Sequence, residues 1–109
     1  MANSFKNRTL RGVGTTATAV GAAVAASTET TLIGMTIANT TSGVINVTVT
    51  LNDGSNTTHI VKTAPVPTGG SLIAVGGDQK IVLMTGDKII VTSDTASSCD
   101  VIMSFLEIT

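Results

Sequence analysis

Few side chains in this sequence can carry catalysis. The 109 residues include one His, one Cys and seven carboxylates, and Phe5 and Phe105 are the only aromatic residues. A general base needs a nucleophile within hydrogen-bond reach, and a catalytic zinc site usually needs three protein ligands. His59 has no second His to work with, and Cys99 has no cationic neighbour in sequence. We therefore expect a protein that is not an enzyme, with no catalytic residue, no metal site and no cofactor.

Other scarce residues exclude further classes. A lone Cys cannot form an intrachain disulfide, so the fold does not depend on an oxidising compartment and fits synthesis in a reducing cytoplasm. Residues 13–26 are small and mildly apolar, but this run is too short for a membrane span and lacks the leucine-rich core of a signal peptide. Without Trp or Tyr, no platform exists on which a sugar ring could stack. We expect no membrane partner, and carbohydrate binding is disfavoured.

Charge is unevenly distributed along the chain. Lys6, Arg8 and Arg11 lie in the first eleven residues without any acid, so that segment has a charge of +3 and the other 98 residues sum to −4. This asymmetry is typical of an arm that docks on an acidic partner, although a solvated N-terminus has the same signature. No basic stripe follows, so nucleic acid is not the expected partner. The sequence predicts an extended N-terminal arm at residues 1–12 and one domain at residues 13–109.

The clearest β pattern lies between residues 45 and 63. From Ile45 to Asn52, aliphatic residues alternate strictly with Asn and Thr, which is typical of a strand with one buried face. The following Asp53-Gly54 pair favours a tight hairpin turn. Residues 57–63 are therefore expected to return antiparallel to the first strand.

Shorter runs repeat this pattern in the rest of the domain. The period of two places Ile33, Met35 and Ile37 on one face of a strand at residues 31–38. Two prolines predict an extended edge or a crossing between sheets over residues 64–68, because proline lacks the backbone donor that a central strand needs. Further strands are expected at residues 71–75, 80–84, 88–93 and 100–108.

Seven or eight such strands, with no helix of normal length between them, predict an all-β fold. Strands at this spacing are typical of an antiparallel β-sandwich or jelly roll. The Ala-rich residues 19–26 are the one place where a helix could form.

Four segments of the domain follow one another in a distinctive order: an "IANTT" strand end, an "APVPTGGSL" edge, a "GGDQKIVLMTGDKIIVTS" hairpin and a terminal "SFLEI" strand. Over about residues 28–108, this order resembles a family of small virion structural proteins of tailed bacteriophages, those of marine and cyanobacterial phages in particular. The earlier segment "TTATAVGAAVAAST" departs from the strand expected there.

The resemblance implies a non-enzymatic β-sandwich protein on the exterior of the capsid, in a virion assembled in the bacterial host cytoplasm. Such a decoration or cement protein binds and stabilises the lattice of the major capsid protein. We expect the basic arm to reach onto the shell, since aromatic and Arg residues often carry interface energy. The residues expected to bind the capsid are Phe5, Lys6, Arg8, Leu10 and Arg11.

Contacts between subunits are expected on the last strand. Residues 100–108 carry apolar side chains on both faces, and Val101, Met103 and Phe105 share one of them. A strand buried on both faces of a small sandwich indicates coverage by another subunit. We predict a homo-oligomer, a cyclic trimer, with an interface that contains Ile102, Leu106 and Ile108.

Two other functions remain open at the level of sequence. The chain could be a tail, neck or fibre-associated protein of the same particle. Ring-forming tail proteins usually have a long hairpin for stacking, whereas the connections here look short, which favours the head. A host-surface glycan-binding module is the further alternative, against which the missing Trp and Tyr count.

Overall fold

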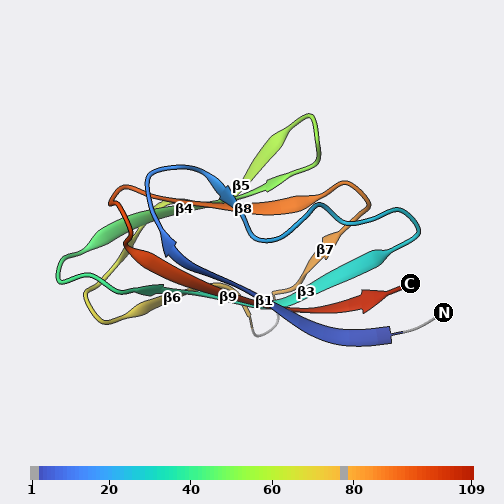
Figure 1. Cartoon of the computed structure of the whole chain (residues 1–109), viewed down its shortest axis with the longest axis horizontal. Coiled ribbons are helices and arrows are strands. Elements are labelled where there is room, and N and C mark those ends of the chain that lie inside the picture. The colour runs from blue at the N-terminus through green and yellow to red at the C-terminus, as the bar shows by residue number, and fades with distance from the viewer. Residues whose placement is uncertain (1–2, 77–78) are drawn as a thin grey trace.

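Two antiparallel sheets stack as a sandwich in the computed structural model, which describes residues 3–76 and 79–109 (Figure 1). The strands are β1 (Asn3–Val13), β2 (Thr18–Ala19), β3 (Glu29–Asn39), β4 (Ile45–Asn52), β5 (Thr57–Val66), β6 (Ser71–Val75), β7 (Ile81–Leu83), β8 (Lys88–Ser93) and β9 (Cys99–Ile108). One sheet has the order β1-β9-β3-β6, with β7 also paired to β3, and the other has the order β2-β8-β4-β5. The predicted all-β sandwich is confirmed, with nine strands among the described residues where seven or eight were expected.

Aliphatic side chains fill the space between the two sheets. Phe105 is the one aromatic residue among the buried hydrophobic side chains of the described chain, at 2% exposure. Because small aliphatic side chains each bury little area, the core draws on nearly every strand. Its other members are Val13, Val20, Val24, Leu32, Met35, Ile37, Ile45, Val47, Val49, Val66, Val75, Leu83, Ile89, Val91, Cys99, Val101 and Met103.

The β4–β5 hairpin forms as the alternating pattern predicts. Strand β4 spans Ile45–Asn52, and its turn is held by the Asp53 carboxylate, whose Oδ1 accepts the N–H groups of Ser55 at 2.9 Å and Asn56 at 2.7 Å. Gly54 lies in this turn with φ of 99°, a left-handed conformation that glycine adopts without strain. The predicted edge is also confirmed, because β5 contains Pro65 and ends the second sheet.

A bulge in β3 changes which side chains of that strand face the core. The pairing of β3 with β9 shifts between Leu32 and Gly34, so one extra residue is inserted there. As a result Leu32 is buried together with Met35 and Ile37, whereas Ile33 is only half-buried. The predicted face of Ile33, Met35 and Ile37 is wrong for Ile33, because a strict period of two does not survive a bulge.

Residues 19–26 do not form a helix. After β2, the Val20 N–H donates to the Ile89 carbonyl at 2.8 Å and the Val24 N–H donates to the Asp87 carbonyl at 2.9 Å. Both valines are buried in the core. The segment thus follows β8 through bends at residues 20–22, and its bonds to Ile89 and Asp87 take the place of helical ones.

The basic N-terminal segment does not extend away from the sandwich. Residues Asn3 to Leu10 pair in unbroken register with Ile108 to Val101 of β9, and this makes β1 an edge strand of the five-stranded sheet. The expectation of an arm that extends away from the domain is therefore wrong, because residues 3–10 pair with β9 within the sheet. Nothing in the first residues predicts this pairing, because the partner strand β9 lies at the other end of the chain.

Candidate functional site

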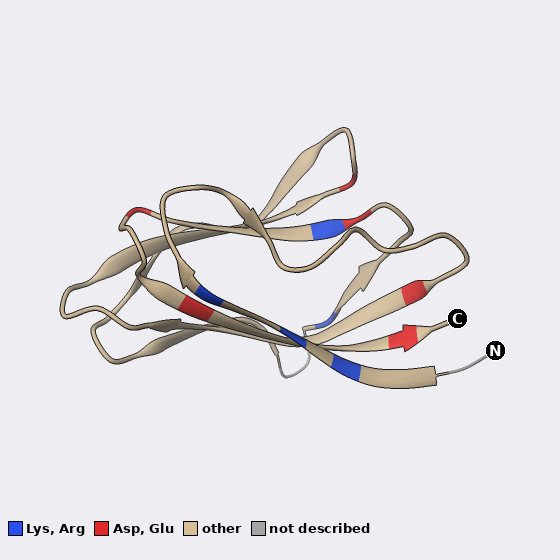
Figure 2. Ribbon diagram, in the orientation of Figure 1, with Lys and Arg blue, Asp and Glu red and all other residues tan. Residues whose placement is uncertain are grey.

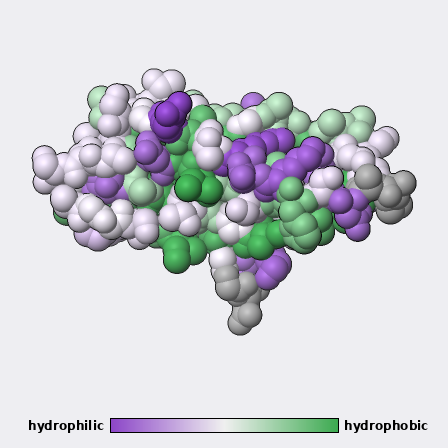
Figure 3. Space-filling view, turned by 60° about the horizontal axis from the view of Figure 1, so that its bottom comes forward, coloured by the Kyte–Doolittle hydropathy of each residue, from purple (hydrophilic) through white to green (hydrophobic). Residues whose placement is uncertain are grey.

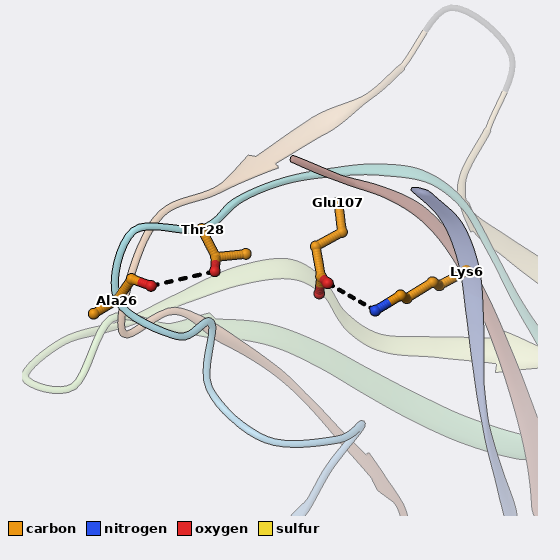
Figure 4. Close-up of polar contacts among 4 residues, drawn as sticks. All are labelled: Lys6, Ala26, Thr28 and Glu107. Atoms are coloured by element: carbon orange, nitrogen blue, oxygen red, sulfur yellow. Dashed lines mark hydrogen bonds and ion pairs between the residues drawn. The ribbon is translucent and has the colours of Figure 1, made fainter. Parts of the chain in front are cut away.

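Two of the basic residues of β1 are engaged within the chain. Lys6 pairs in register with Phe105, and its Nζ lies 2.8 Å from Glu107 Oε1, as the close-up shows beside the Thr28–Ala26 hydrogen bond (Figure 4). The Lys6–Glu107 ion pair is exposed, and exposed pairs contribute about 0–1 kcal/mol. Lys6 therefore holds the edge strand in place only weakly.

Arg8 connects the edge strand to the other sheet. Its guanidinium lies 4.9 Å from the centroid of the Phe105 ring, and its Nη1 donates to the carbonyls of Ala22 at 3.1 Å and Val20 at 3.4 Å. Gly21 makes room for this arrangement, since a Cβ there would lie 2.5 Å from Arg8 Cδ. Arg8 thus covers one side of the core and satisfies two carbonyl groups, which makes it a structural residue in the isolated chain.

The other three predicted capsid-binding residues differ in exposure. Phe5 is 79% exposed and Arg11 is also exposed, whereas Leu10 packs partly against the core. The structure therefore divides the predicted capsid-binding set. Phe5 and Arg11 are presented to solvent, while Lys6, Arg8 and Leu10 make contacts within the chain.

The outer face of the five-stranded sheet collects most of the large exposed hydrophobic residues. Register places Thr9, Ile102, Thr36 and Ile73 in one row across β1, β9, β3 and β6. A second row runs through Phe5, Leu106, Thr31 and Val82 across β1, β9, β3 and β7. The exposed fractions are 79% for Phe5, 69% for Ile73, 65% for Val82 and 55% for Ile102.

Charge is confined to the ends and edges of this outer face. Glu29 of β3 marks one end of this face and Asp100 of β9 marks the other. In the rows between these two ends, no paired residue whose side chain lies on the outer face is charged. Figure 2 accordingly shows the coloured segments of β3 and β9 near the strand ends. Arg11 lines a shallow hollow with Asp100 at one end, and Lys80 precedes the edge strand β7. In the space-filling view, hydrophobic residues form several groups with hydrophilic residues between them (Figure 3).

All three predicted subunit-interface residues lie on this outer face. Ile102 is exposed, and Leu106 and Ile108 are half-buried, in alternation with the buried Val101, Met103 and Phe105. The two apolar faces expected for the last strand are present. Sequence reasoning missed Ile73 and Val82, because only the strand order brings them into line with β9.

The residues considered for catalysis lie apart from one another. His59 is exposed on β5, and Cys99 is buried in β9. Burial raises the pKa of the Cys99 thiol, which makes it less reactive as a nucleophile. In residues 3–76 and 79–109, no three His, Cys, Asp or Glu side chains are grouped so that they could hold a metal ion. The same residues include no helix that is long and apolar enough to cross a membrane.

Comparison with known proteins finds a likeness among solved structures only. No protein-family model matches this chain, and no curated protein matches it. Among solved structures, the chain is similar to one titled "Structure of infectious bursal disease virus Gt strain", with a TM-score of 0.45 and 12% sequence identity. The match covers 98% of this chain and 30% of that chain. The function of the outer face must therefore be argued from its own residues.

Two turn carboxylates should make stability depend on pH in the acid range. Backbone N–H groups of Asn56 and Ser55 lower the pKa of Asp53, and the backbone and side-chain N–H groups of Asn46 lower the pKa of Asp94. A lowered pKa means that the stabilisation is complete above the ordinary value of about 3.9 and is lost as pH falls through the lowered value. Urea unfolding followed at about pH 5 and about pH 2 should show this loss, and the D53N/D94N double variant should show less of it. Equal losses in both proteins would contradict the assignment.

Proposed function

We propose that this chain is a non-enzymatic structural protein of a tailed-bacteriophage particle, a decoration or cement protein that binds the major capsid protein lattice on the capsid exterior. The order of segments from "IANTT" to "SFLEI" supports the phage setting, through its resemblance to small virion proteins. The fold supplies a rigid module with two candidate surfaces for assembly, the outer face and the unpaired edge of β1.

The observation that carries this proposal is the uncharged outer face with its exposed Phe5, Ile73, Val82 and Ile102. Soluble monomers rarely keep a contiguous apolar patch of more than a few hundred Å², and larger patches mark sites of interaction with proteins or membranes. Permanent interfaces are also richer in apolar area and poorer in charge than transient ones. A subunit of a lasting protein assembly fits this surface better than an enzyme or a transient binder.

The capsid contact is proposed at the free edge of β1. Lys6 and Arg8 already have partners within the chain, so Arg11 is the basic residue of the segment that is offered to an acidic capsid residue. An unpaired edge can also accept a strand from another protein, with main-chain hydrogen bonds as the source of affinity. Deleting residues 2–12 would remove β1 itself, so point variants test this contact more cleanly than a truncation.

Charge reversal at Arg11 should weaken capsid binding. In a binding assay with capsids that lack the protein, we expect R11E to lose about tenfold in affinity, because an attractive pair becomes a repulsive one. K62E also reverses a positive charge, on β5 in the other sheet, and should bind as the unmodified protein does.

Immunogold labelling with antibody against residues 28–109 should place gold over phage heads. Particles without labelling would contradict the virion role. An unchanged affinity of R11E would contradict the contact between Arg11 and the capsid.

A tail, neck or fibre-associated role is the second candidate. The observation that favours it is the β4–β5 hairpin, whose end stands clear of the rest of the second sheet (Figure 1). A projecting hairpin of this kind could reach a neighbouring subunit in a ring. Gold confined to the neck or tail would select this role and exclude the cement function.

A further inference from the structure

We propose that the outer face of the five-stranded sheet packs against the same face of a second copy of this chain, so that the protein is a two-fold dimer. This inference concerns the isolated protein and does not depend on the capsid-binding proposal. It replaces the cyclic trimer expected from the sequence. A two-fold contact of this face with itself uses the same surface on both copies, which closes the assembly at two copies.

The spacing of the apolar rows suits a two-fold arrangement. The row through Ile102 and the row through Leu106 lie on either side of a central polar row that contains Asn7, Ser104 and Gly34. A two-fold axis along the central row exchanges the two apolar rows. Ile102 of one copy then meets Leu106 of the other, and the Ile73 end of one row meets the Val82 end of the other, so apolar side chains meet across the interface as in the core of a sandwich.

Charge also favours a second copy over a different partner. The interior of the face offers no charged group at its paired positions, so a partner with charged residues would bury them without compensation. A second copy of this chain brings no charged residue to the paired positions in the interior of the face. At one end of the face, Arg11 and Asp100 line the same hollow, so the two charges there have opposite signs.

The size of the described chain permits an interface of the usual area. Its longest and shortest extents are 45 Å and 22 Å, which bound a face seen edge-on in Figure 1 at about 1,000 Å². A standard stable interface buries about 800 Å² on each partner. Packing of the two copies over most of this face would cover Phe5, Ile73, Val82 and Ile102 together.

Sedimentation of the full chain tests this directly. Interfaces of this size have Kd values in the micromolar range at their weakest. At a protein concentration of about 100 µM, the unmodified protein should therefore sediment as a dimer. Its mass should be about 22 kDa, twice 11.0 kDa. We expect I102K to lose at least about 100-fold in dimer affinity, because two lysines would enter the interface without acidic partners. V44K introduces the same charge at an equally exposed valine outside the sheets and should remain a dimer.

Circular dichroism and thermal melting establish that the variants fold. If I102K fails to fold, I73K gives the second test, since Ile73 lies in the same row on the edge strand β6. A monomeric unmodified protein, a trimer, or a dimer that survives a folded I102K or I73K would each overturn the proposal. A protein that is monomeric yet saturates capsids would overturn the dimer and leave the capsid function standing.

Discussion

Replacing Phe105 with alanine should lower the free energy of unfolding by about 3–5 kcal/mol, the usual cost of deleting a buried aromatic ring. Phe105 is 2% exposed and lies on β9 between β1 and β3. Its ring also supports the Arg8 guanidinium at 4.9 Å. The change would thus leave a cavity in an otherwise aliphatic core and loosen the one side chain that ties the edge strand to residues 20–22.

Phe5 provides a matched control for this measurement. It is the same residue type at 79% exposure on the neighbouring strand, and truncation of such a side chain usually changes stability by less than about 0.5 kcal/mol. Both substitutions should be made in the I102K background, so that loss of a dimer contact at Phe5 does not enter the comparison. Urea unfolding gives both free energies. Similar losses for F105A and F5A would show that Phe105 does not have the buried role assigned to it.

Strands β4 and β8 of the second sheet could be read from the sequence because their signal is local, whereas the short β2 of the same sheet was not predicted. The alternation from Ile45 to Asn52 and the run from Lys88 to Ser93 match β4 and β8 residue for residue. Each strand buries one face against the core, so the period of two in the sequence reproduces the period of two in the pleat. The Asp53-Gly54 turn is equally local, since its hydrogen bonds span two or three residues.

The first strand could not be predicted in this way. Lys6 and Glu107 are 101 residues apart in sequence, and nothing near Lys6 indicates an acidic partner at the far end of the chain. Three basic residues without an acid therefore predict an extended arm that docks on an acidic partner. In the sheet, two of these charges are explained by contacts with Glu107, Phe105 and the carbonyls of residues 20 and 22.

The sequence predicts only part of the outer face, because strand order is again not visible in it. Ile102, Leu106 and Ile108 alternate along one strand, so sequence spacing alone assigns them to one face. Ile73 and Val82 join that face only because β6 and β7 both pair with β3, which in turn pairs with β9. Strand order is a non-local property, and periodicity carries no information about it.

Replacing Asn39 with alanine should lower the free energy of unfolding by about 2–4 kcal/mol, because it removes a buried polar group that holds two segments together. The Asn39 Nδ2 donates to the carbonyls of Gly43 at 2.8 Å and Val66 at 3.0 Å. Its Oδ1 accepts the backbone N–H of Thr41 at 2.9 Å and the Thr41 hydroxyl at 2.8 Å. One side chain, 4% exposed, thus fixes the turn after β3 and connects it to the end of β5.

Two further variants separate this role from a general effect of losing an Asn. N39D keeps the size and the acceptor oxygens but replaces the donor with a carboxylate that faces two carbonyls, so at neutral pH it should be at least as destabilising as N39A. N56A removes an exposed Asn in the β4–β5 turn whose bond to Asp53 is made by the backbone, and it should change stability by less than about 0.5 kcal/mol. Urea unfolding at pH 7 orders the three proteins. A stability of N39D near that of the unmodified chain would mean that the Nδ2 bonds to Gly43 and Val66 do not hold this end of the sandwich together.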